Sequence, residues 1–388
     1  MIPWRRQQFN NQYSPEKYAR FLALLEQRFG EPVQFRHSET PVFLPHAEVE
    51  KMSRYGAELL NALDNPQYRQ ESNAAIPENY RVPNEPPKPL FVQADFGLDE
   101  NLEPKLVEIQ GFPSLYAYQP VMAAAYREAY AIPDDLLPEL TPGAYDELLK
   151  DAIVGKHDPA NVFLTEIDPW HQKTRHDFRV TEQKFGIRAV DIRELTKRGN
   201  RLYHGETPVH RIYNRVIFDE IERRHIELPF DLRDDINVEW AGHPNWFFRL
   251  SKFSLPYLHH PSVPHTQFLN KVGRVDHPER FVLKPLYSFA GLGVVVGPTQ
   301  EQIDAVPPAL RKDYILQERV DFRPVIATPR GPTKIEVRIM YIWLDTLIPV
   351  NTIIRMGRGA QMGVDHNKNM EWVGASAAFI DQAASIEK

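Results

Sequence analysis

Apolar and polar residues follow two different periods along this chain of 388 residues, and the changes between them mark the predicted elements. Apolar residues spaced three and four apart predict amphipathic helices over 14–30 and 46–63. The first of these has clear boundaries, because Ser14 is a good N-cap and Gly30 ends the pattern. Further helices are predicted over 123–131 and 175–185.

Short runs of β-branched and aromatic residues predict strands of two kinds. Paired runs separated by a turn predict antiparallel hairpins within 90–110, 281–296 and 333–354. Runs that alternate with helices predict a small parallel α/β layer, and they cover 162–165, 187–190 and 209–216. Residues 64–89 are polar and rich in proline, and we expect a loop there. The predicted fold class is therefore α+β.

Composition limits the function. The hydrophobic fraction of 42% and the charged fraction of 25% are typical of a globular protein in solution. The net charge of −6 does not favour a nucleic-acid partner, and the absence of cysteine excludes disulfides, thiolate metal sites and a cysteine nucleophile. No apolar leader or membrane-length apolar run occurs, so we expect a cytoplasmic protein without a membrane partner. The oligomeric state stays open.

The stretch 281–294 predicts a phosphate-binding turn. An apolar strand ends at Lys284, and a turn of small residues follows it, with Ser288, Ala290, Gly291 and Gly293. Backbone N–H groups of such a turn can close on an anion, and the lysine adds a positive charge. The order differs from a P-loop, in which the lysine follows the glycines. An ordinary hairpin with a glycine-rich turn fits the same pattern.

The hairpin within 90–110 carries oxygen ligands. Glu108 and Gln110 share one face of a strand, and Asp95 lies on the paired strand. Two carboxylates and an amide oxygen suit Mg²⁺, although a polar, solvated hairpin is the common alternative. A second candidate metal site, at His259, His260 and His265, has no helical ligand spacing, and we interpret these residues as surface histidines.

Together these motifs resemble the ATP-grasp superfamily, which includes D-alanine–D-alanine ligase, glutathione synthetase and biotin carboxylase. The residues that carry the resemblance are, in chain order, Lys252, Lys284, Gln317–Glu318, Glu336–Arg338, Arg355, Asn367, Asn369 and Gly374. The hairpin with Asp95, Glu108 and Gln110 looks like the metal motif of the superfamily, but it stands at the other end of the chain. This order is similar to that of circularly permuted members such as glutathionylspermidine synthetase.

The resemblance implies an ATP-grasp fold of two α+β lobes, circularly permuted, with an added α/β layer. In that arrangement 1–112 completes the large lobe, 113–245 is the α/β substrate domain, 246–318 is the small lobe, and 319–388 is the rest of the large lobe. It also implies ATP and Mg²⁺ as cofactors.

The implied roles follow the motifs. Lys252, Lys284 and the turn with Ser288, Ala290, Gly291 and Gly293 would bind the phosphates; Gln317, Glu318 and Val320 the adenine; Asp321 the ribose; and Asp95, Glu108 and Gln110 the metal. Arg338 and Arg355 would be catalytic. Substrate contacts would come from Ser114, Arg211, Arg215 and Asn369.

The implied function is an ATP-dependent ligase that joins a carboxylate to an amine or thiol through an acyl-phosphate, on a small molecule or peptide. Three positions depart from the superfamily pattern: Gln110 replaces an asparagine, Gln93 replaces an arginine that several ligases carry, and Gly374–Ala375 replaces a Gly-Gly pair. These departures leave open two alternatives, a kinase of the same fold and a nucleotide-binding protein without turnover.

Overall fold

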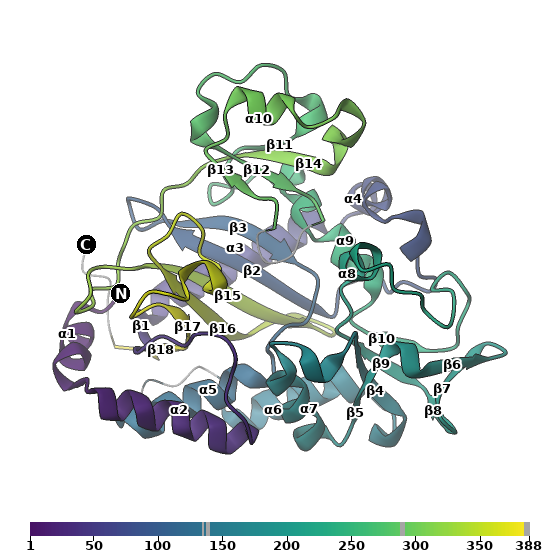
Figure 1. Cartoon of the computed structure of the whole chain (residues 1–388), viewed down its shortest axis with the longest axis horizontal. Helices are drawn as coiled ribbons and strands as arrows, with labels where there is room; N and C mark the ends of the chain where they lie inside the picture. The colour runs from purple at the N-terminus through teal and green to yellow at the C-terminus, as the bar shows by residue number, and fades with distance from the viewer. Residues whose placement is uncertain (134–135, 137–139, 288–291, 384–388) are drawn as a thin grey trace.

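A computed structural model describes the chain except for residues 134–135, 137–139, 288–291 and 384–388 (Figure 1). Its centre is an antiparallel sheet with the strand order β17-β16-β15-β2-β3. The bounds are β17 (Gly374–Ser376), β16 (Leu347–Gly357), β15 (Lys334–Trp343), β2 (Phe91–Leu98) and β3 (Pro104–Gln110). Strands β2 and β15 are neighbours, so segments from both ends of the chain build one sheet.

A second antiparallel sheet lies above the central one in Figure 1, in the order β11-β14-β12-β13. We call the part of the chain around this sheet the small lobe. The strands are β11 (Thr266–Phe268), β14 (Tyr314–Glu318), β12 (Phe281–Pro285) and β13 (Val295–Val296). The predicted hairpin within 281–296 is confirmed, because β12 pairs antiparallel with β13.

The middle of the chain forms the predicted α/β layer, a parallel sheet in the order β10-β9-β4-β5. Its strands are β10 (Glu239–Ala241), β9 (Arg211–Asn214), β4 (Val162–Glu166) and β5 (Arg188–Asp191). A small meander, β6 (Leu195–Arg198), β7 (Arg201–His204) and β8 (Thr207–Val209), projects from it, and β1 (Val42–Pro45) pairs parallel with β18 (Ala378–Asp381). The predicted strand over 209–216 is wrong in its bounds, because Val209 ends β8 of the meander and β9 of the parallel sheet covers only Arg211–Asn214.

Ten α-helices lie in the described part of the chain. They are α1 (Pro3–Gln12), α2 (Pro15–Phe29), α3 (His46–Leu63), α4 (Pro66–Glu71), α5 (Tyr118–Tyr130), α6 (Pro142–Val154), α7 (Arg175–Phe185), α8 (Phe218–Arg223), α9 (Pro244–Arg249) and α10 (Gln300–Asp304). Helices α2, α3 and α7 confirm the sequence prediction, whereas α4 lies in the segment predicted as a loop. Asn65 explains α4, because its side chain accepts from the N–H of Tyr68 as an N-cap.

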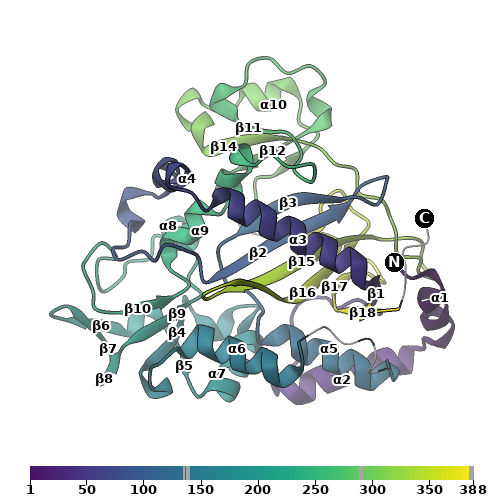
Figure 2. The ribbon, with the colours of Figure 1, turned by 180° about the vertical axis from the view of Figure 1, so that it is seen from behind.

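The two faces of the central sheet have different neighbours. Helix α3 crosses one face (Figure 2), and it lies so close that a Cβ on Gly56 would come within 2.1 Å of the Tyr341 hydroxyl oxygen. On the other face, Met340 and Ile342 belong to the core that includes α5. Towards the other end of β15 this second face carries charged side chains instead, on the side of the small lobe.

Candidate functional site

Charged residues gather on one face of the central sheet because the strand register places them opposite each other. Asp95 of β2 lies between Arg338 of β15 and Glu108 of β3. One step along the sheet, Glu336 of β15 lies opposite Arg355 of β16. Side chains alternate between faces along a strand, so Glu336 and Arg338 share this face. Two arginines and three carboxylates therefore meet on neighbouring strands.

Asp95 is fully buried and is bound by two guanidinium groups. Arg338 donates from Nε to Oδ1 at 2.5 Å and from Nη2 to Oδ2 at 2.6 Å, and Arg355 donates from Nη1 to Oδ2 at 3.1 Å. Burial pushes the pKa of Asp95 up, but the two arginines outweigh it, so its pKa lies below that of an ordinary carboxyl group. Both oxygens of Asp95 are thus already occupied by donors.

The two arginines differ in how accessible their guanidinium groups are to a ligand. Arg338 also donates from Nη1 to the Gln93 side-chain oxygen at 2.8 Å, and only 5% of its side chain is exposed. Arg355 donates from Nη1 to Glu336 as well as to Asp95, and 24% of its side chain is exposed. Burial raises the pKa of Glu336, and Arg355 offsets this only in part. Arg355 is therefore the arginine of the pair that an incoming anion can reach.

A β-bulge places Glu108. The pairing of β2 with β3 shifts between Asp95 and Phe96, which leaves Val107 as the extra residue of β3. Because of this shift, Leu106 and Ile109 are both buried, while Glu108 and Gln110 are partly exposed on the charged face. Gln110 donates from Nε2 to Glu108 Oε1 at 2.5 Å. The bulge thus keeps one carboxylate and one amide together at the rim of the cluster.

The small lobe contributes two buried lysines. Lys284 of β12 donates to the Gln317 side-chain oxygen of β14 at 2.6 Å and to the Val107 carbonyl at 3.3 Å, so it joins the small lobe to the bulge. Lys252, at the start of a 3-10 helix (Lys252–Tyr257), lies 3.8 Å from Glu108 Oε2. Burial lowers the pKa of Lys284 to about 8; Glu108 and Glu336 oppose the shift, and Lys252 adds to it.

Four cations and three carboxylates therefore converge between the central sheet and the small lobe. We call these residues the charged cluster: Lys252, Lys284, Arg338, Arg355, Asp95, Glu108 and Glu336. The cluster has an excess of one positive charge in a largely buried place. Such a place favours an anion with several oxygens, because the anion can take over hydrogen bonds that now go to neutral groups.

The remaining nucleotide residues of the sequence prediction lie around this cluster in different ways. Gln317 is buried and donates to the Thr266 hydroxyl at 3.2 Å, whereas Glu318 and Asp321 are exposed and Val320 is half-buried. Asp321 pairs with Arg319 at the surface. Gly293 has a φ of +72°, as a tight turn requires. Ser288, Ala290 and Gly291 lie outside the described residues.

The predicted substrate residues are not brought together. Arg211 opens β9 at the edge away from the cluster, where it donates to the carbonyls of Ile153 and Ala152 at the end of α6. These bonds satisfy free carbonyl groups in the last turn of α6, whose C-cap is Gly155, so the geometry gives Arg211 a structural role. Asn369 is exposed.

Arg215 and Ser114 lie closer to the cluster. Arg215 follows the carboxyl end of β9 and is fully buried against Asp177, at 2.5 Å. The Ser114 carbonyl accepts from Gln93 Nε2 at 2.9 Å. Gln93 therefore connects Arg338 to the segment that leaves β3.

Two residues near the site, Glu336 and Asn367, carried the resemblance to the superfamily but were given no role of their own. Glu336 stands two positions before Arg338, and strand alternation alone would have placed both on one face. Asn367 is buried and organises the loop after β16: its oxygen accepts from the N–H groups of Arg358 and Gly359, and its nitrogen donates to the carbonyls of Gln361 and Gly363. The sequence motif left open whether Asn367 or Asn369 has this place, and the structure buries Asn367 and exposes Asn369.

Two absences concern only the described part of the chain. There, no group of three or more histidine, aspartate or glutamate side chains is arranged to hold a metal. The same residues contain no helix that is both long and apolar enough to cross a membrane.

Comparison with known proteins gives one kind of match. No protein-family profile and no curated protein sequence matches the chain. Among solved structures, the fold matches a glutathione synthetase-like effector (GSS30) from Globodera pallida in its apo form, with a TM-score of 0.65 and 11% identity, over 95% of this chain and 98% of that one. The chain therefore has a glutathione synthetase-like fold along nearly its whole length.

Proposed function

We propose that this protein is an ATP- and Mg²⁺-dependent ligase that joins a carboxylate to an amine or thiol, on a circularly permuted ATP-grasp fold. The observation that carries the proposal is Lys284, a buried lysine of the small lobe that reaches across to the bulge beside Glu108. A buried ammonium group with neutral acceptors gains from an anionic ligand, and the rest of the charged cluster surrounds it.

The two lysines would bind the nucleotide phosphates. Lys284 would exchange the Gln317 and Val107 oxygens for phosphate oxygens, and Lys252 would bind beside it. Arg355 would stabilise charge on the transferring phosphoryl group, since it is the more exposed arginine of the cluster. Arg338 would act by holding Asp95 in place.

The donor set at β3 fits a magnesium ion, but only in part. Glu108 and Gln110 offer a carboxylate and an amide oxygen at the rim, and Mg²⁺ commonly takes one or two protein carboxylates together with substrate phosphates. Asp95 does not fit as a direct ligand, because three guanidinium hydrogen bonds already occupy its oxygens. The bound ion would neutralise charge on the phosphate oxygens. We therefore assign Glu108 and Gln110 to the metal and make Asp95 a positioning residue.

The proposed reaction needs no protein nucleophile. A substrate carboxylate oxygen attacks the γ-phosphorus, the bond to the β-phosphate oxygen breaks, and ADP leaves. The amine or thiol then attacks the acyl carbon, phosphate leaves with the bonding electrons, and the proton passes to solvent. The acceptor would enter beside Ser114, where Gln93 connects Arg338 to the start of the α/β layer.

Two other activities share the same nucleotide site. A kinase would transfer the phosphoryl group to a hydroxyl and stop, and a binding protein would not turn over. Gln93 and Gln110 allow the binding protein, because they stand where several ligases have an arginine and where the superfamily usually has an asparagine.

The first test is thermal stabilisation by ATP with and without Mg²⁺. A ligand at 100 times its dissociation constant stabilises by about 2.7 kcal/mol. We expect the wild type to shift, Lys284→Ala to lose the shift, and Glu108→Ala to lose its dependence on Mg²⁺. Lys150→Ala, on the exposed face of α6, is the matched control, and it should keep both the thermal shift with ATP and its dependence on Mg²⁺.

The second test is product formation. Release of ADP in the presence of a pooled carboxylate and amine, with an amide in the products, supports the ligase. ADP release with a hydroxyl acceptor supports the kinase. Binding without ADP release supports the third alternative, and no stabilisation at millimolar Mg-ATP contradicts all three.

A further inference from the structure

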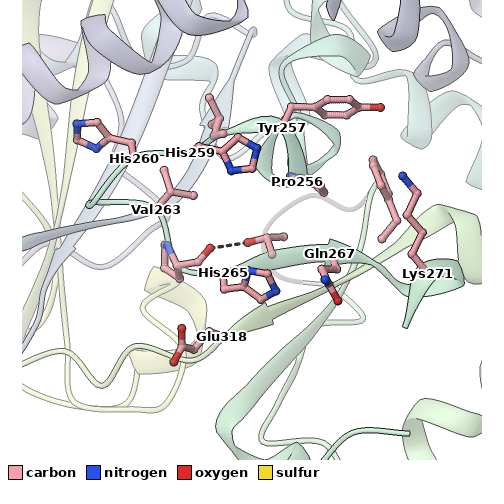
Figure 3. Close-up of a pocket in the computed structure, with 13 residues that line it drawn as sticks. Pro256, Tyr257, His259, His260, Val263, His265, Gln267, Lys271 and Glu318 are labelled. Carbon is pink, nitrogen blue, oxygen red and sulfur yellow. Dashed lines mark hydrogen bonds between the residues drawn. The ribbon is translucent and has the colours of Figure 1, made fainter. Parts of the chain in front are cut away.

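A cavity of about 650 Å³ lies outside the charged cluster. It opens between the segment 256–264 and strand β11, and Lys271 at the end of the next 3-10 helix and Glu318 at the end of β14 complete its wall (Figure 3). No residue of the charged cluster lines it. Its volume is in the range of small-molecule sites, which is about 300–1,000 Å³.

The walls of the cavity are fixed by contacts within the chain. The rings of Tyr257 and Phe268 pack edge to face, with their centres 5.8 Å apart. His260 bonds through Nδ1 to the Ser262 hydroxyl at 2.7 Å and through Nε2 to Glu58 of α3 at 3.0 Å. The loop that forms one wall is therefore held by helix α3, and the opposite wall is strand β11.

Opposite charges stand on the two sides of the cavity. In Figure 3, Glu318 and Lys271 lie at opposite ends of β11, with His265 and Gln267 between them. Both charged side chains are exposed. A ligand that matches this arrangement carries an ammonium group at one end and a carboxylate at the other.

Strand β11 offers backbone groups to such a ligand. It is the edge of its sheet, and the Glu318 N–H donates to the His265 carbonyl at 2.7 Å. In an antiparallel ladder successive residues turn their backbone groups alternately inward and outward. His265 and Gln267 therefore face β14, and the N–H and C=O groups of Thr266 and Phe268 face the open edge. An extended peptide can bind such an edge as an added strand.

We propose that this cavity binds a short zwitterionic peptide that lies along the open edge of β11, with its amino group at Glu318 and its carboxylate at Lys271. An extended chain spans about 3.4 Å per residue, so a peptide of about two or three residues matches the three residues of β11.

Thr266 connects this site to the charged cluster. It lines the cavity, and its hydroxyl accepts from Gln317 Nε2, while Gln317 Oε1 accepts from Lys284. Peptide binding should therefore change the affinity for nucleotide. This coupling rests on the proposed function, whereas the peptide binding does not. By linkage, nucleotide changes the peptide affinity by the same factor.

Isothermal titration of the nucleotide-free protein with Gly-Gly-Gly tests the binding. We expect saturable binding, and binding about tenfold weaker for N-acetyl-Gly-Gly-Gly and for the C-terminal amide, since each loses a charge-assisted hydrogen bond. Lys271→Glu should lower the affinity for Gly-Gly-Gly to a similar degree, and the matched surface variant Lys150→Glu should leave it unchanged. Absence of saturable binding, equal binding of the blocked peptides, or an unchanged Lys271→Glu variant overturns the proposal.

The coupling is tested separately, by titrating ATP with and without saturating Gly-Gly-Gly. A changed ATP affinity supports the link through Thr266, and an unchanged affinity overturns it. If ATP does not bind at all, the proposed function fails, but the peptide titration still shows whether the cavity binds a peptide.

Discussion

Replacing Asp95 by asparagine tests whether this residue positions the arginines or binds the metal. Asp95 is fully buried and accepts three hydrogen bonds from Arg338 and Arg355. Asparagine keeps the shape but removes the charge, so the buried Arg338 and the partly exposed Arg355 keep only Glu336 as a nearby carboxylate on their two strands. Breaking a buried ion pair costs about 3–5 kcal/mol. With about 2 °C of melting temperature per kcal/mol in a large domain, we expect a fall of about 6–10 °C.

Glu108→Gln is the matched comparison, because it removes a carboxylate from the next strand at a partly exposed position. We expect its melting temperature to change by about 2 °C or less, since partly exposed ion pairs contribute about 1 kcal/mol or less. Glu108→Gln should abolish the Mg²⁺ dependence of ATP binding. Asp95→Asn, measured below its own melting temperature, should keep this dependence in weakened form.

A double-mutant cycle with Arg338→Gln completes the test. Because Asp95 and Arg338 contact each other directly, the double variant should be less destabilised than the sum of the single variants, by at least about 1 kcal/mol. An Asp95→Asn protein with wild-type stability and no Mg²⁺ response would refute the reasoning and return Asp95 to the metal.

Three further predictions use other parts of the chain. Lys284 has a pKa of about 8 without nucleotide, and phosphate favours its charged form, so ATP affinity should fall by up to about tenfold per pH unit above pH 8, measured by titration across pH 7–9.5. Burial raises the pKa of Glu166 to about 8 from 4.5, so the folded state binds the extra proton and stability falls as the pH rises between these values. Glu166→Gln should therefore increase the free energy of unfolding at pH 8 by about 2–4 kcal/mol, which is seen as a higher melting temperature. At pH 4.5 the substitution should change the stability little. Gly56→Ala should destabilise by about 1–3 kcal/mol in urea unfolding because of the Tyr341 hydroxyl, whereas the control Gly143→Ala, with open space around it, should not.

The sequence was informative where local patterns determine the structure. Helix α3 begins and ends at the predicted residues, because its apolar stripe repeats at helical spacing over the whole length. The hairpins β2–β3 and β15–β16 follow from paired apolar runs. Alternation within β15 would also have placed Glu336 beside Arg338 on one face.

The interactions of these side chains depend on pairing between distant segments, which no local pattern contains. Asp95 and Arg338 are 243 positions apart in the sequence, and only the register of β2 on β15 brings them into contact. The bulge at Val107 changes which residues of β3 are buried, and it has no mark in the sequence. Arg211 and Arg215 were both expected near the end of a strand over 209–216, but β9 covers Arg211–Asn214, so Arg211 opens the strand and only Arg215 follows its carboxyl end.

The state of Lys284 connects the fold to the proposed activity. Without nucleotide, its buried ammonium group has two neutral oxygen acceptors, one from its own lobe and one from the central sheet. Burial lowers the pKa of Lys284, because neutral acceptors offset the loss of water less than a negative charge would, and Lys252 adds to the shift. A phosphate oxygen would supply the missing negative charge between the small lobe and the central sheet. Nucleotide binding and the contact of the small lobe with the central sheet would then stabilise each other through one side chain. Glu108, on the same strand as the Val107 acceptor, would stay available to the metal.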